Sequence, residues 1–266
     1  MGSEKVVLYS IAKPFLAQAV LELGLPLEAP IGDYVEGLAP VYASRTIKRL
    51  LNHTAGLADY GFLRAYHEAV DARLPAWPRE ELLERCLEFP HKAQGFQYSN
   101  IGYLLLRMLV EERTGMGVYG ALEKLVFEPL GIEGLEEWDS PTDIVPGYDP
   151  RWVYHSTFVA QLEAVAPAFA ALAKHRAETT GLATGIVAVN HENTGFETPG
   201  YGLGLMADSG SETEHPRFVG HGGGGPGFGL MVLTNTDTWQ TELEYSAGGF
   251  NQTEAILRLR AKLVAN

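Results

Sequence analysis

The residue pattern changes character partway along the chain, and this change limits the folds that the chain can adopt. Up to about residue 130, apolar residues recur every three or four positions, the spacing of one helix face. The helices expected in this half cover residues 10–23, 46–51, 60–72, 78–88, 102–114 and 117–127. From Tyr201 onward, short apolar runs separated by turn residues indicate strands. The sequence therefore predicts an α+β protein.

The second half supplies an antiparallel sheet flanked by helices. After a loop-like stretch over 131–155, we expect helices over 158–177 and 251–264. The expected strands cover residues 201–206, 217–221, 228–235 and 240–246, joined by short turns. We expect a single unit over residues 1–266, in which about 25–155 is mostly helical and about 1–24 plus 156–266 form a sheet-and-helix region.

Charge and composition exclude several classes of protein. Twenty Lys and Arg against 33 Asp and Glu give a net charge of −13, which argues against a nucleic-acid or anionic-membrane surface. No apolar run approaches the roughly 18 residues that span a bilayer. The first residues lack a secretion signal, so cytoplasmic location is the default expectation. Cys86 is the single cysteine, which excludes an internal disulfide and a thiolate-rich metal site.

Ser10 and Lys13 stand three residues apart at the start of the first expected helix. Residues at this spacing are neighbours on one helix face, so a hydroxyl lies beside an amine. An amine whose pKa is lowered by burial or nearby cations can remove the hydroxyl proton. The pair makes Ser10 a candidate nucleophile, although Ser-x-x-Lys also arises by chance.

A second candidate group is Tyr98-Ser99-Asn100, just ahead of the helix expected over 102–114. The phenol can relay a proton, and the amide can bind a substrate carbonyl and a lysine amine together. The structural alternative is a packed tyrosine ring followed by an asparagine that caps the helix.

The third candidate is the glycine-rich stretch from Gly220 to Phe228, which contains His221. Glycine lets a strand backbone approach a ligand, and a free N–H on such an edge can stabilise an oxyanion. His221 adds a titratable group beside it. No Gly-Lys-Ser/Thr follows, which disfavours a phosphate loop. A purely structural glycine turn is the other interpretation.

Other hydrolase and metal signatures are missing from the sequence. Neither a Gly-x-Ser-x-Gly elbow around Ser10 nor a His-Glu-x-x-His zinc motif occurs. The remaining histidines are scattered, and we expect them to be surface or core residues: His53, His67, His91, His155, His175, His191 and His215.

Taken in order, the three candidate groups resemble the motifs of one family, the class C β-lactamase-like serine hydrolases. Ser10-Ile11-Ala12-Lys13, Tyr98-Ser99-Asn100 and His221-Gly222-Gly223 match its Ser-x-x-Lys, Tyr-x-Asn and Lys-Thr-Gly or His-x-Gly motifs. The family includes penicillin-binding carboxypeptidases, D-amino-acid peptidases and esterases. Three connecting stretches are also similar to the family: Leu50 to Leu57, Tyr201 to Gly204, and His221 to Phe228.

The resemblance implies a reaction through an acylated serine. Ser10 would attack the substrate carbonyl, while Lys13 and Tyr98 share the proton transfers, with the identity of the first base left open. Asn100 would orient the substrate carbonyl and Lys13.

The same resemblance implies a binding role for the glycine-rich strand. His221 would take the place usually held by lysine, beside the substrate and Tyr98, and Gly222 and Gly223 would bind substrate with it. The backbone N–H groups of Ser10 and Gly224 would form the oxyanion hole. No metal or organic cofactor is implied.

Two departures from the family matter. Family members normally have a helix and two strands ahead of the nucleophile, whereas nine residues precede Ser10 here. We therefore expect the N-terminal strands to be shortened or missing, and an uncovered sheet edge would invite self-association. The second departure, His221 in place of lysine, is typical of esterase-like relatives.

We therefore expect a serine hydrolase that cleaves a small ester, an amide or a peptide-like substrate. A D-Ala-D-Ala carboxypeptidase or a β-lactamase is the alternative enzyme. A catalytically silent, family-shaped binding protein is the alternative from another class, although the intact Ser10, Lys13, Tyr98 and Asn100 argue against it.

Overall fold

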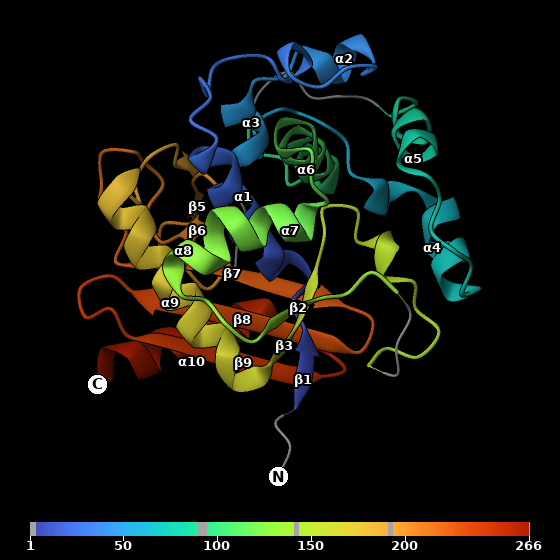
Figure 1. The fold of residues 1–266 in the computed structure, drawn as a ribbon. Helices are drawn as coiled ribbons and strands as arrows, with labels where there is room; N and C mark the ends of the chain where they lie inside the picture. Colours follow the sequence, from blue (N-terminus) through green and yellow to red (C-terminus); the bar gives the residue numbers. More distant parts are fainter. Residues whose placement is uncertain (1–3, 90–94, 141–143, 191–193, 266) are drawn as a thin grey trace.

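The computed structural model describes residues 4–89, 95–140, 144–190 and 194–265. Its main element is a six-stranded sheet, whose strands β8 (Phe228–Asn235) and β9 (Thr241–Ala247) pack against α9 (Leu162–Thr179) and α10 (Gln252–Ala265). Figure 1 shows the helices of the first half of the chain gathered on one side of this sheet. The expected α+β architecture is confirmed.

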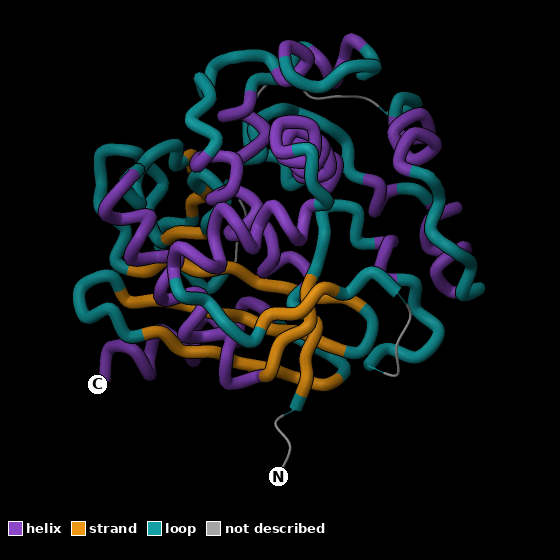
Figure 2. Tube along the Cα trace, in the orientation of Figure 1, coloured by secondary structure: helices purple, strands orange, loops and turns teal. Residues whose placement is uncertain are grey.

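The first half of the chain consists of short helices joined by turns (Figure 2). Within it, α6 (Asn100–Thr114) packs beside α1 (Ala12–Glu22) and α3 (Ile47–Leu51). The other helices described here are α2 (Pro40–Ala43), α4 (Arg64–Asp71), α5 (Arg79–Cys86), α7 (Val118–Leu122) and α8 (Glu128–Leu130). Single helical turns are η1 (Tyr9–Ile11), η2 (Ile31–Asp33), η3 (Tyr60–Phe62), η4 (Glu123–Phe127) and η5 (Pro150–Trp152). Most helix positions predicted from apolar spacing are therefore correct to within a few residues.

The main sheet is antiparallel, with the strand order β4-β5-β6-β7-β8-β9. Its remaining strands are β4 (Val187–Ala188), β5 (Gly200–Tyr201), β6 (Met206–Ala207) and β7 (Phe218–Gly225). Side chains alternate across β8: Leu230 and Val232 join the core around α1 and α9, whereas Met231 and Leu233 pack with α10. Because both faces are covered, the sequence of β8 is a continuous apolar run.

A second sheet has three strands in the order β1-β3-β2, formed by β1 (Lys5–Val7), β3 (Phe158–Gln161) and β2 (Leu135–Glu137). The expectations of a loop over 131–155 and a helix over all of 158–177 are wrong at β2 and β3. Val159 lies opposite both Val7 and Glu136, so β3 is paired on each side. A short apolar run has no period that separates strand from helix, and strands distant in sequence decide the outcome.

The expectation of one strand over 201–206 is also wrong. The chain forms β5 and β6 there, joined by a turn in which Gly202 N–H donates to Leu205 C=O at 2.8 Å. Gly204 has φ of 89° in this turn, a conformation that favours glycine. By contrast, β7 continues beyond the expected 217–221 and carries its glycines to residue 225.

The strand described ahead of Ser10 is β1, and it belongs to the three-stranded sheet rather than the main one. At three residues, this strand is short. β9 forms one edge of the main sheet, and self-association through it stays a prediction. Cys86 is buried and unpaired. None of the described helices combines the length and apolar character needed to cross a membrane.

Candidate active site

Ser10 is held at the junction of η1 and the glycine-rich strand β7. Tyr9, just before it, has φ of 47°, which turns the chain sharply into α1. The Tyr9 hydroxyl donates to the Pro226 carbonyl at 2.5 Å, in the β7–β8 turn. A Cβ on Gly223 would lie 2.2 Å from the Leu8 carbonyl oxygen. Glycine at 223 is therefore required for η1 to approach β7 so closely.

Lys13 is fully buried one turn into the helix and reaches back to Ser10. Its Nζ lies 2.8 Å from Ser10 Oγ and 2.7 Å from Asn100 Oδ1. Burial lowers the pKa of Lys13 well below its usual value, and the nearby Asp59 carboxylate only partly opposes that shift. The site therefore favours the neutral amine, the form that can accept a proton.

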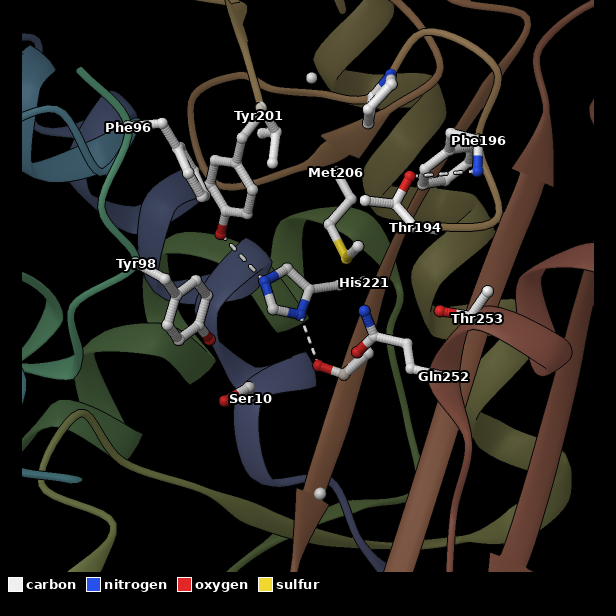
Figure 3. A pocket seen from close by; sticks show the side chains of 15 residues that line it. Ser10, Phe96, Tyr98, Thr194, Phe196, Tyr201, Met206, His221, Gln252 and Thr253 are labelled. Atoms are coloured by element: carbon white, nitrogen blue, oxygen red, sulfur yellow. Dashed lines mark hydrogen bonds between the residues drawn. The ribbon is translucent and has the colours of Figure 1, made fainter. Parts of the chain in front are cut away.

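Tyr98 precedes α6, and its hydroxyl points toward Ser10 (Figure 3). Burial of its hydroxyl raises the pKa of Tyr98, and a hydrogen bond with Ser10 opposes this in part. Lys13 Nζ lies 5.0 Å from the centre of the Tyr98 ring. The phenol is therefore neutral at ordinary pH and able to donate a proton.

Asn100, the first residue of α6, is oriented by a carboxylate that the sequence pattern did not reveal. Its backbone N–H donates to Asp59 Oδ2, and its side-chain Nδ2 donates to Asp59 Oδ1 at 3.3 Å. Gly61 N–H also donates to Asp59 Oδ1, at 2.7 Å. With Nδ2 directed at Asp59, the Asn100 carbonyl oxygen faces Lys13.

His221 is buried on β7 and hydrogen-bonded through both ring nitrogens. Its Nδ1–H donates to the Gly222 carbonyl at 2.6 Å, and Nε2 accepts from the Tyr201 hydroxyl at 2.9 Å. Burial, followed by the nearby Lys13, lowers the pKa of His221 to about 3. His221 is therefore a neutral group in this site.

The edge of β7 beside Ser10 is open. The Phe218 N–H donates to Asp208 Oδ1, and the Phe218 C=O accepts from the Asp208 N–H. The backbone groups of Phe218 therefore point toward β6. Backbone groups alternate along a strand, so those of Gly222 and Gly224 also point away from β8. β6 ends opposite Gly220. The Gly224 N–H therefore lies on an uncovered edge, and a Cβ on Gly224 would meet nothing within 4 Å.

Two cavities flank Ser10 and Gly224. The larger, about 620 Å³, is mostly apolar, and none of its described lining residues is Asp, Glu, Lys or Arg. Figure 3 shows Phe196 and Met206 across this cavity from Tyr98, with His221 between. The smaller cavity, about 150 Å³, contains Asp59 and His155 and is walled by aromatic side chains.

The structure therefore brings together most of the residues that the motifs suggested. Ser10, Tyr98, His221, Gly222 and Gly224 all line the larger cavity, and Lys13 and Asn100 lie directly behind Ser10. Gly223 faces Leu8 and Ile11 instead.

Three site residues were missed by sequence reasoning: Asp59, His155 and Tyr201. The sequence indicated a role for Tyr201 only through the stretch from Tyr201 to Gly204, which resembles the family. Asp59 and His155 belong to distant segments with no recognisable spacing from Ser10. Among the residues that the structure describes, no cluster of His, Cys, Asp or Glu side chains could hold a metal ion.

Comparison with known proteins gives one matching family model, described as Beta-lactamase, over residues 3–248. The chain is 26% identical over 234 residues to a D-aminopeptidase of Brucella anthropi, covering 80% of this chain and 44% of that protein. It is 30% identical over 131 residues to penicillin-binding protein 4* of Bacillus subtilis, covering 47% of this chain and 29% of that protein. The chain thus spans less than half the length of these relatives.

The fold is shared with solved structures at lower identity. A D-stereospecific amidohydrolase from Streptomyces sp. superimposes with a TM-score of 0.77 and 21% identity, covering 93% of this chain and 83% of that one. This likeness supports the arrangement of helices and sheet described above.

Proposed function

Because the chain belongs to the β-lactamase family, as its three motifs led us to expect, we propose that it is a serine hydrolase. It cleaves an ester or amide bond through an acyl-Ser10 intermediate. The observation that carries this proposal is the buried Lys13 amine, 2.8 Å from Ser10 Oγ and fixed from behind by Asn100. A lysine with a lowered pKa beside a serine hydroxyl is a suitable base for activating it.

The two proton-transfer groups take different roles. Burial lowers the pKa of Lys13 and raises that of Tyr98, so one is an amine without its proton and the other a phenol with it. Lys13 removes the Ser10 proton as Oγ attacks the carbonyl. Tyr98, hydrogen-bonded to Ser10, passes a proton to the leaving group. The same groups then activate water for deacylation.

The negative charge formed on the carbonyl oxygen is stabilised by backbone N–H groups of Ser10 and Gly224. This role for Gly224 rests on its place at the open edge of β7. Two N–H donors aimed at a developing oxyanion are among the largest contributions to acyl-transfer catalysis. Asn100 positions Lys13, and its second side-chain N–H is free to contact the substrate carbonyl.

The larger cavity favours an uncharged substrate group. A carboxylate placed there would be desolvated without a cation, since His221 is held neutral and the described lining carries no Lys or Arg. The substrates of D-Ala-D-Ala carboxypeptidases and β-lactamases carry such a carboxylate. We therefore favour small esters and peptide-like amides. The D-aminopeptidase and D-stereospecific amidohydrolase names of two similar proteins support testing D-amino acid amides.

The test combines active-site labelling with turnover. A fluorophosphonate probe should label the protein but not the Ser10→Ala variant, and p-nitrophenyl acetate should be hydrolysed with the same dependence on Ser10. Turnover rates are then measured with D-phenylalanine amide, nitrocefin and a D-Ala-D-Ala peptide to rank the substrate classes. Nitrocefin turnover above ester turnover would reverse our ranking. A folded protein with no Ser10-dependent labelling or turnover would instead support the silent binding protein.

A further inference from the structure

Tyr9 is a buried residue whose side chain the mechanism above does not use. It is 3% exposed, and its φ of 47° lies in the left-handed region, which a residue with a side chain adopts at a cost. Such a conformation persists where the surrounding contacts hold it. The peptide between Tyr9 and Ser10 carries the Ser10 N–H. Contacts that fix Tyr9 therefore also fix the direction of that N–H.

The Tyr9 side chain is held by the end of the glycine-rich hairpin. Its hydroxyl donates to the Pro226 carbonyl at 2.5 Å. A Cβ on Gly225 would overlap the Tyr9 ring, so the ring lies directly on the Gly225 backbone. Burial, followed by the nearby Tyr66, raises the pKa of Tyr9, so the hydroxyl keeps its proton at ordinary pH. The side chain thus connects η1 with the turn between β7 and β8.

This turn has a geometry that does not suit a hairpin by itself. Gly225 pairs with Phe228 across the two residues of the turn, Pro226 and Gly227. The proline ring fixes φ at about −65°, and Gly227 has φ of 87°. This combination is that of a type II turn. Type II turns match the twist of paired strands less well than the mirror-image types do, so the turn depends on support from outside the hairpin.

The hydroxyl of Tyr9 supplies such support. Types I and II differ in the orientation of the central peptide, which here carries the Pro226 carbonyl. By donating to that carbonyl, Tyr9 favours the type II orientation. The Gly227 carbonyl accepts from the Gly248 N–H at 3.1 Å. Gly224, two residues before Pro226, lies on the uncovered edge of β7, so its position depends on the pairing with β8 and on this turn.

We propose that Tyr9 is a positioning residue, which holds the β7–β8 turn so that the Gly224 N–H stays at a fixed place opposite the Ser10 N–H. This role rests on the proposed function, because these two N–H groups are the donors of its oxyanion hole. Without the hydroxyl, the peptide after Pro226 can rotate toward the type I geometry, and Gly224 moves with it. The oxyanion then has one well-placed donor instead of two, which slows acylation and leaves substrate binding unchanged.

The first test removes the hydroxyl alone. Tyr9→Phe keeps the ring on Gly225 and loses the donor to Pro226. We expect the kcat for p-nitrophenyl acetate and the fluorophosphonate labelling rate to fall by about tenfold, at unchanged KM.

Tyr42→Phe is the matched control. Tyr42 is also buried, and its hydroxyl donates to the Leu83 carbonyl at 2.8 Å, in a part of the helical region that lines neither cavity beside Ser10. The substitution removes the same kind of hydrogen bond, so it should lower stability by a similar amount. Its kcat should stay within about twofold of the parent protein.

A change of one substrate atom separates positioning from simple packing. Sulfur is a weaker hydrogen-bond acceptor than oxygen and has a longer bond to carbon, so an intact oxyanion hole favours the ester over its thionoester. The ratio of kcat/KM for p-nitrophenyl acetate to that for p-nitrophenyl thionoacetate should fall about threefold or more in Tyr9→Phe. The ratio should stay at the parental value in Tyr42→Phe, because a general loss of stability affects both substrates alike.

Gly227→Ala tests the turn from its other residue. A Cβ there would lie 3.7 Å from Val145, an ordinary contact, so the cost of the substitution comes from the positive φ. We expect the same fall in the oxygen-to-sulfur ratio. Because both changes act on one turn, the variant carrying both should be at most about threefold slower than the slower single variant. Thermal unfolding of every variant checks folding, and Gly227→Ala decides if Tyr9→Phe does not fold.

The proposal is overturned if folded Tyr9→Phe keeps the parental kcat, or if it loses kcat at an unchanged oxygen-to-sulfur ratio, which would assign the hydroxyl to packing alone. Losses that multiply in the variant carrying both substitutions would show that Tyr9 does not act through the turn. Absence of Ser10-dependent labelling in the parent protein would contradict the hydrolase function itself, and the role of Tyr9 with it.

Discussion

Ser10 separates two regions built on opposite principles. Behind it, the proposed proton-transfer side (Lys13, Asn100, Asp59 and His155) is a largely buried network of polar contacts. In front, the proposed substrate side is the mostly apolar cavity of about 620 Å³. A buried polar network tolerates little change because each lost partner leaves a desolvated group, whereas an apolar wall can be reshaped gradually. Changes on the first side should therefore reduce kcat, and changes on the second should mainly alter KM.

The largest effect is expected at Gly223, where β7 packs against the turn that carries Ser10. A Cβ there would overlap the Leu8 carbonyl, so Gly223→Ala must push η1 away from β7. We expect a loss of about 2–3 kcal/mol in unfolding free energy and about a 100-fold loss in kcat, because Ser10 is displaced. Gly224→Ala is the matched control for stability, since its Cβ meets nothing within 4 Å. Denaturant unfolding of both variants measures the difference, and equal stability would refute the proposed contact.

A smaller effect is expected from Asp59→Asn on the proton-transfer side. Asp59 now accepts hydrogen bonds from the backbone N–H and the side-chain amide of Asn100. The substitution turns one accepting oxygen into an NH₂ group, which faces one of these donors. Asn100 then loses its fixed orientation toward Lys13. We expect a loss of about tenfold in kcat with little change in KM, from a hydrogen-bond penalty of about 1–3 kcal/mol.

Asp149→Asn provides the comparison for that variant. Asp149 is also a buried carboxylate that caps a helical turn, η5, by accepting from Arg151 N–H. Its replacement should reduce stability without a matching loss in kcat. Steady-state kinetics and thermal unfolding of both variants show whether Asp59 has a kinetic role beyond its contribution to stability. Similar kinetic losses would mean that Asp59 acts only through folding.

The smallest effect is expected from Phe196→Ala on the substrate side. Removing this ring from the cavity wall reduces apolar contact with a bulky acyl group while leaving the polar network intact. We expect KM to rise about tenfold for p-nitrophenyl hexanoate and to change little for the acetate. The ratio of the two KM values is an internal control against misfolding. An unchanged ratio would place the acyl group outside this cavity.

The two regions also differ in how far the sequence predicts them. Ser10 and Lys13 follow from spacing along one helix, and Tyr98 and Asn100 from a short motif, because those relations are local. Asp59 contacts Asn100 from 41 positions away in the sequence, and His155 contacts Lys13 from 142 positions away. No periodicity encodes such distant contacts. The same limit explains the missed strand β3, which is defined by partners on both sides rather than by its own four residues.

The glycines of β7 differ in the space available for a side chain, and this difference indicates where substrate selectivity could be changed. A Cβ on Gly223 would meet the Leu8 backbone carbonyl, and a Cβ on Gly225 would meet the Tyr9 ring, so both positions exclude a side chain. Gly224 lies between them, lines both cavities, and has open space where a side chain would project. Position 224 is therefore a suitable target for directed evolution. A side chain introduced there would narrow the space beside the proposed nucleophile and leave the backbone N–H of residue 224 in place.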